Sequence, residues 1–105
     1  MDQIKIFKAL SNETRLNILL WLKNAEENFE PQLHANVMKD FPDGVCVRSI
    51  QKRAELSQST ISNFMATLEE ANLVESRKID KYTYFRLNKK TLKEVAGWIG
   101  DTFAD

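Results

Sequence analysis

The sequence predicts one small domain that is mainly α-helical and carries a single β-hairpin. Its 105 residues suffice for one hydrophobic core. Apolar side chains recur at helical spacing along most of the chain. Two short runs rich in β-formers, 74–79 and 82–87, flank the polar pair Asp80-Lys81 as in a hairpin. We therefore expect residues 1–105 to form one domain with the order helix, helix, insert, helix, helix, strand, strand, helix.

The N-terminal part of the chain predicts two helices. The first is short and carries the apolar residues Ile4, Ile6, Phe7 and Leu10. Ser11 is a suitable N-cap for the second, which spans about residues 12–24. This second helix is apolar almost all round, with Leu16, Ile18, Leu19, Leu20, Trp21 and Leu22. We therefore expect it to be central and buried.

Residues 25–45 interrupt the helical pattern and form an insert. They contain Pro31, Pro42, Gly44 and many acidic residues, with one short helix expected around 33–39. A third helix follows over 47–54, where Val47, Ile50 and Ala54 form its apolar side.

The stretch 57–73 predicts an amphipathic helix with an unusual exposed face. Ser57 is a good N-cap, and Asn72 suits a left-handed end. The buried stripe is Ile61, Phe64, Met65 and Leu68, and the opposite side carries Ser59, Asn63, Ala66 and Glu70, flanked by Ser62 and Thr67. Amide and hydroxyl side chains can pair with base edges in the major groove. Only about three residues separate this helix from the third, which fits helix-turn-helix geometry. A surface helix that is polar only for solubility is the alternative.

Positive charge is concentrated just after this helix, although the formal net charge is zero. Residues 74–93 contain seven Lys or Arg against two acids, Glu75 and Asp80. Such a patch favours contact with phosphates, and an ordinary solvated charge run is the alternative. The basic hairpin after a helix-turn-helix is called a wing.

The terminal helices carry apolar stripes that a domain of this size need not bury internally. They consist of Ile4 and Phe7 in the first helix and Leu92, Val95, Ala96, Ile99 and Phe103 in the last. We expect a second copy of the chain to cover them in a homodimer, which suits paired DNA half-sites about 34–36 Å apart. Packing of both helices on their own domain is the alternative.

Four blocks of the sequence resemble the ArsR family of small dimeric winged-helix repressors. They are Phe-Lys-Ala-Leu-Ser-Asn-Glu-Thr-Arg-Leu-Asn-Ile-Leu (7–19), Leu-Ser-Gln-Ser-Thr-Ile-Ser (56–62), Glu-Glu-Ala-Asn-Leu-Val (69–74) and the Arg-Lys…Tyr-Phe-Arg-Leu hairpin (77–87). The resemblance covers about residues 4–99, and the insert matches least. It implies a winged helix-turn-helix and a homodimer on a palindromic double-stranded DNA operator. The positions that match base-contacting residues are Gln58, Ser59, Thr60, Ser62 and Asn63. The expected phosphate or minor-groove contacts are Arg77, Lys78, Lys81 and Arg86, with Lys52 and Arg53 as further candidates.

This chain departs from the family pattern at three places. Asn63 stands near a position that is commonly His, which changes the possible base preference. Glu55 occupies a turn position that is often Gly, and a left-handed non-Gly residue there costs on the order of 1 kcal/mol. The hairpin tip also lacks Gly, although Asp80 tolerates a positive φ.

The usual metal switch of the family is not expected here. Relatives carry Cys-Val-Cys where this chain has Cys46-Val47-Arg48, and a soft-metal site usually needs three or four Cys or His ligands. A Cys46–His34 pair is conceivable, but Cys46 is more simply a small apolar residue. A redox response at Cys46 is an open alternative that needs a depressed thiol pKa. We expect no cofactor, no metal site and no enzymatic activity, since no catalytic constellation or phosphate-binding glycine loop is present.

The single cysteine fits a reducing compartment, and no apolar run suggests a signal peptide or a membrane span. The expected protein is thus a cytoplasmic regulator with no membrane partner, and its inducer is unknown. A winged helix used for protein–protein contact is the main rival, because the net charge is neutral and Glu69 and Glu70 lie on the polar helix.

Overall fold

The structure is a computed structural model that describes residues 1–32 and 35–104. Its helices are α1 (Gln3–Leu10), α2 (Glu13–Lys23), α3 (Ala25–Asn28), α4 (Ala35–Asp40), α5 (Val47–Ala54), α6 (Gln58–Glu70) and α7 (Lys89–Phe103). Its strands are β1 (Val45–Cys46), β2 (Val74–Ile79) and β3 (Tyr82–Leu87). The mainly helical class with one hairpin is confirmed, and the two hairpin strands have the predicted bounds.

The three strands form one antiparallel sheet in the order β1-β3-β2. The hairpin pairs Val74 with Leu87 at its base and Ile79 with Tyr82 at its tip. Asp80 has a φ of 55° in the connecting turn, as its tolerance for left-handed backbone allows. The two-residue strand β1 was not predicted, because it is recognisable only through its pairing with Tyr84 and Phe85.

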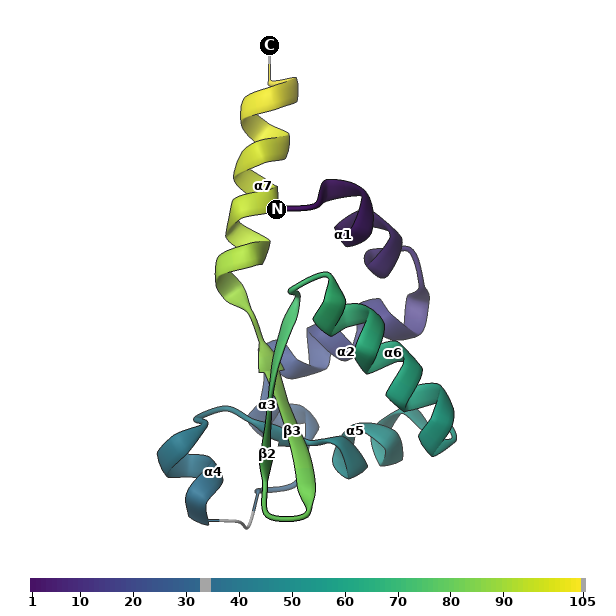
Figure 1. The fold of residues 1–105 in the computed structure, drawn as a ribbon, viewed down its shortest axis with the longest axis vertical. Helices are drawn as coiled ribbons and strands as arrows, with labels where there is room; N and C mark the ends of the chain where they lie inside the picture. The colour runs from purple at the N-terminus through teal and green to yellow at the C-terminus, as the bar shows by residue number, and fades with distance from the viewer. Residues whose placement is uncertain (33–34, 105) are drawn as a thin grey trace.

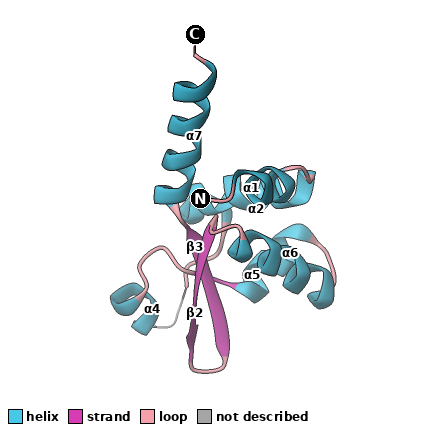
Figure 2. Ribbon diagram, turned by 45° about the horizontal axis from the view of Figure 1, so that its top comes forward, coloured by secondary structure: helices cyan, strands magenta, loops and turns pink. Residues whose placement is uncertain are grey.

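The elements are arranged around the hairpin, which we call the wing. Helices α5 and α6 lie on one side of it and α4 lies on the other (Figures 1 and 2). Helix α7 leaves the base of the wing and extends away from the wing tip (Figure 1). The molecule is elongated, with extents of 48 × 29 × 22 Å. The wing tip and α7 therefore lie at opposite ends.

The main core joins α1, α2, α5, α6, the sheet and the first turns of α7. Ile18, Leu68 and Leu73 are completely buried in it. A smaller cluster of Val37, Phe41, Ile79 and Tyr84 joins α4 and the following turn to the wing.

The prediction that α2 is buried all round was wrong. Leu16 and Leu20 are 43% and 53% exposed, while Ile18, Leu19 and Leu22 are buried. Leu16 and Leu20 are four residues apart and so share one side of the helix, which none of the other described elements covers. The N-cap is Asn12, whose side chain accepts from the backbone N–H of Arg15 at 2.9 Å. Ser11, the predicted cap, instead ends α1.

The turn between α5 and α6 contains a residue in the left-handed conformation that is not glycine. Glu55 has φ 56° and ψ 42° and ends α5. Its backbone N–H donates to the carbonyl of Gln51 at 3.0 Å, so the helix end is satisfied. Asn72 adopts the predicted left-handed conformation after α6, with φ 59°.

We expect Glu55→Gly to raise the free energy of unfolding by about 0.5–1 kcal/mol. Glycine removes the Cβ strain of the left-handed conformation, and its greater freedom in the unfolded chain offsets part of that gain. Urea denaturation measures the effect. Glu55→Ala is the matched control, because it removes the carboxylate and keeps the Cβ; equal stability of the two variants would contradict the strain argument.

Candidate nucleic-acid interface

Helix α6 presents the polar face that the sequence predicted, and this face is uncharged in the N-terminal half of the helix. Ser57 caps the helix, since its Oγ accepts from the backbone N–H of Thr60 at 3.2 Å. Ile61, Met65 and Leu68 are buried, which turns the opposite side outward. The exposed residues of this side are Gln58, Ser59, Ser62, Asn63 and Ala66. Thr60 is half-buried, and its hydroxyl accepts from Ser57 Oγ at 2.9 Å, so it belongs more to the cap than to the exposed face.

Helix α5 lies beside the N-terminal half of α6, and a groove runs between them. Arg48 and Gln51 of α5 line it together with Gln58 and Ser62 of α6. This arrangement places one polar side chain, Gln51, and one basic side chain, Arg48, next to the exposed face of α6.

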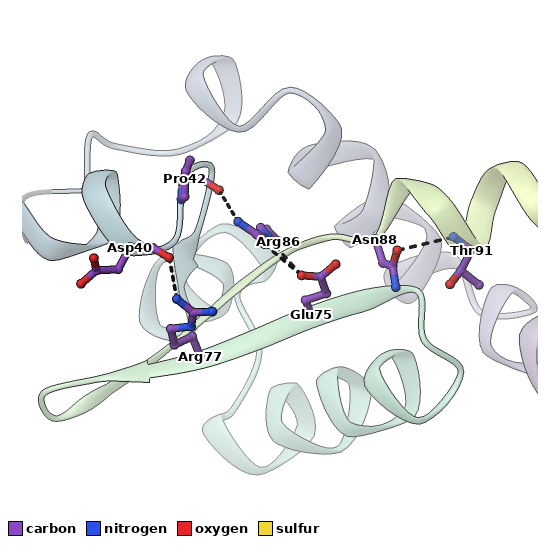
Figure 3. A network of polar contacts seen from close by, with 7 residues as sticks. All are labelled: Asp40, Pro42, Glu75, Arg77, Arg86, Asn88 and Thr91. Atoms are coloured by element: carbon purple, nitrogen blue, oxygen red, sulfur yellow. Dashed lines mark hydrogen bonds and ion pairs between the residues drawn. The ribbon is translucent and has the colours of Figure 1, made fainter.

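Two of the predicted wing contacts are occupied within the chain. Arg77 donates to the carbonyl oxygen of Asp40 at 2.5 Å (Figure 3). Its guanidinium lies 5.2 Å from the centre of the Phe41 ring. Arg86 forms an ion pair with Glu75 at 3.0 Å and lies 4.2 Å from the same ring. Arg86 also donates to the carbonyl oxygen of Pro42 at 3.3 Å (Figure 3).

We call Phe41, Arg77 and Arg86 the arginine clasp. It fixes the wing to the segment that follows α4, and Phe41 is only 1% exposed. The clasp occupies one N–H donor of Arg77 and three of Arg86, so a phosphate contact by either residue would use the remaining donors and stays a prediction.

Lys78 and Lys81 are exposed near the wing tip. Within the part of the chain that the structure describes, neither ammonium group has an ion-pair or hydrogen-bond partner. Of the four predicted wing cations, these two are the ones that have no partner among the described residues.

The two basic residues predicted on α5 differ in their surroundings. Lys52 pairs with Glu30 at 2.8 Å, and this hydrogen bond raises the pKa of Lys52 and lowers the pKa of Glu30. The pair is highly exposed, so Lys52 can exchange the carboxylate for a phosphate. Arg53 lies 4.8 Å from the centre of the Trp21 ring and donates to Asn28 at 3.2 Å, which holds it against α2 and α3.

Arg48 is an interface candidate that the sequence interpretation missed. Its Nη1 donates to the hydroxyl of Tyr82 at 3.1 Å, and its guanidinium lies 5.5 Å from the centre of that ring. The sequence did contain a sign that Arg48 belongs to the interface. Arg48 and Lys52 are four residues apart, so they share one side of a helix. Its partner on the wing could not be foreseen from spacing.

Cys46 is half-buried and immediately precedes α5. Its backbone N–H donates to Gln32 at 2.9 Å, and its side chain packs against the cluster around Phe41. Over residues 1–32 and 35–104, no group of three or more His, Cys, Asp or Glu is placed to hold a metal ion. His34 lies outside these residues, so its pairing with Cys46 is untested.

Most residues of the expected dimer surface are exposed to solvent in the single chain. Ile4, Phe7, Ile99 and Phe103 are 64%, 38%, 41% and 73% exposed, and Ala96 is also exposed. Phe7 contacts Trp98, with ring centres 6.4 Å apart, so α1 and α7 meet at this surface.

Val95 is 5% exposed and Leu92 is half-buried. Both pack on the chain's own core, so Val95 has almost no surface to offer a partner. Leu16 and Leu20 add exposed apolar area that the sequence interpretation assigned to the core. None of the described helices is both long and apolar enough to cross a bilayer.

Comparisons with known proteins agree with this geometry. Residues 45–76 match the model of the family described as "Bacterial regulatory protein, arsR family". An uncharacterized HTH-type transcriptional regulator of Bacillus subtilis, YbzH, is 37% identical over 101 residues, covering 94% of this chain and 96% of the relative. The arsenical resistance operon repressor of Escherichia coli is 32% identical over 85 residues, but these cover only 58% of its length. The structure of an ArsR-like transcriptional regulator from Rhodococcus has a TM-score of 0.72 at 25% identity, covering 96% of this chain and 78% of that one.

Proposed function

Because the chain belongs to the arsR family of bacterial transcriptional regulators, we propose that it binds a palindromic operator as a homodimer and represses the adjacent promoter. The observation that carries the proposal is the exposed face of the N-terminal half of α6, whose polar residues are uncharged. Gln58, Ser59, Ser62 and Asn63 suit base edges and would repel neither bases nor phosphates. We place this activity in the cytoplasm. The chain is a regulator and not an enzyme.

The interface divides into two parts with different roles. Helix α6, the recognition helix, enters the major groove and distinguishes base pairs. Lys78, Lys81 and Lys52 contact phosphates and supply a salt-dependent attraction that is the same for every sequence. Two copies related by a two-fold axis then engage half-sites about 34–36 Å apart.

We expect Lys78→Ala and Asn63→Ala to separate these roles. Lys78→Ala weakens binding to operator and scrambled duplexes alike and lowers the salt slope by about one unit for each lost phosphate contact. Asn63→Ala reduces discrimination between the two duplexes, by about 1–3 kcal/mol for each base pair it contacts. Fluorescence anisotropy over a salt series, on an operator selected from random duplexes, measures both quantities. Equal loss of discrimination in both variants would refute the division.

A winged helix devoted to protein–protein contact is the rival in a different class. It predicts no salt-sensitive binding to any duplex, whereas the proposal predicts binding that falls steeply with salt. A gel-shift panel of unrelated duplexes at several salt concentrations separates the two.

These contacts do not identify the signal that causes the protein to dissociate from DNA. A response through the Cys46 thiol stays a prediction. If the thiol responds, peroxide treatment should change the operator affinity of the wild-type chain. It should leave the operator affinity of the Cys46→Ser variant unchanged. Elemental analysis of the purified chain tests the metal-responsive alternative.

A further inference from the structure

Arg48 and Tyr82 connect the helix-turn-helix to the tip of the wing. Arg48 lies in the first turn of α5, and Tyr82 is the first residue of β3, directly after the hairpin turn. The 3.1 Å hydrogen bond and the 5.5 Å approach of the guanidinium to the ring join these elements across 34 residues of sequence. Both side chains are exposed, so their contact belongs to the surface and not to the core.

Arg48 also lies next to the recognition helix. Arg48 lines the groove that contains Gln58 and Ser62, and Lys52 follows one turn later on the same side of α5. A DNA strand that runs from the recognition helix to the wing would therefore pass this arginine.

The chemistry of Arg48 leaves it free to bind an anion. A guanidinium has five N–H donors in a fixed plane, and the hydrogen bond to Tyr82 uses one of them. Stacking on the aromatic ring fixes the orientation of that plane. No carboxylate is paired with Arg48 within the described residues, in contrast to Lys52 and Arg86.

We propose that Arg48 binds a backbone phosphate of the operator between the recognition helix and the wing, and that Tyr82 positions its guanidinium. The inference rests on the proposed DNA-binding function. It assigns a DNA contact to a position where the family resemblance leads one to expect a metal-binding cysteine. Arg48 thus adds a phosphate contact to those proposed for the wing lysines.

The test is the salt dependence of duplex binding by Arg48→Ala in the full chain. We expect affinity for operator and scrambled duplexes to fall about 10- to 30-fold, and the salt slope to decrease by about 1.8 units, since each dimer loses two phosphate contacts. Arg48→Lys keeps the charge, so it should retain the slope. Tyr82→Phe keeps the ring but removes the acceptor, and should weaken binding about threefold with the slope unchanged.

Lys93→Ala is the matched charge control, because Lys93 is exposed on α7, away from the wing tip. It should leave the slope unchanged. Lower affinity of Arg48→Ala with the wild-type slope would assign Arg48 a structural role only and overturn the inference, as would wild-type binding by this variant. Absence of salt-dependent binding by the wild-type chain would instead overturn the proposed function. Thermal unfolding of each variant verifies that it is folded.

Discussion

Phe41→Ala is expected to lower the free energy of unfolding by about 3–5 kcal/mol. The ring is 1% exposed, and it holds the insert to the wing through Val37, Ile79 and Tyr84. Its loss leaves a cavity and removes both guanidinium contacts of the arginine clasp. For a domain whose total stability is about 5–15 kcal/mol, this is a large fraction. Equilibrium denaturation in urea measures the loss.

Phe41→Leu is the control, because it keeps most of the apolar volume and removes only the aromatic face. It should lose clearly less stability than Phe41→Ala. We also expect operator affinity to fall in Phe41→Ala under conditions where the chain is still folded, because the wing is no longer fixed to residues 40–42. If Phe41→Ala lowered the free energy of unfolding by less than about 1 kcal/mol, the clasp would not be what holds the insert to the wing.

Ile99→Glu is expected to convert the proposed homodimer into monomers. Ile99 is 41% exposed on α7, on the surface where Phe7 of α1 meets Trp98. Two carboxylates would be placed in an apolar interface without partners, which is strongly unfavourable. Operator affinity should then fall by about 100-fold or more, because each monomer engages a single half-site. Sedimentation equilibrium and anisotropy measure the two effects.

Lys93→Glu is the matched variant, since it adds a carboxylate to the same helix away from the apolar stripe. It should remain dimeric. A dimeric Ile99→Glu variant would place the subunit contact elsewhere, for example on the exposed Leu16 and Leu20 of α2.

The sequence predicted elements that depend on local signals. The strands 74–79 and 82–87 were placed correctly because β-forming runs flank a turn residue that tolerates positive φ. The outward face of α6 followed from the spacing of its apolar residues and its Ser57 cap. Helix α3 was missed because it is only four residues long and buries none of them.

What the sequence did not show depended on contacts between distant segments. Periodicity showed that α2 is apolar all round but not which side the other helices cover, so Leu16 and Leu20 were misplaced. The roles of Arg77 and Arg86 depend on Asp40 and Pro42, which are 37 and 44 residues away. Only the three-dimensional structure shows that the Phe41 ring contacts the guanidinium groups of both Arg77 and Arg86.

The central claim is that the recognition helix and the wing tip form the DNA-binding surface. Mapping amide chemical-shift changes in the ¹⁵N-labelled chain, upon titration with a duplex of about two helical turns, tests it most directly. We expect the largest changes at Arg48, at 58–63 and at 78–82, and we expect them to decrease with added salt. Changes confined to α4 or to the distal half of α7, with 58–63 unaffected, would contradict it.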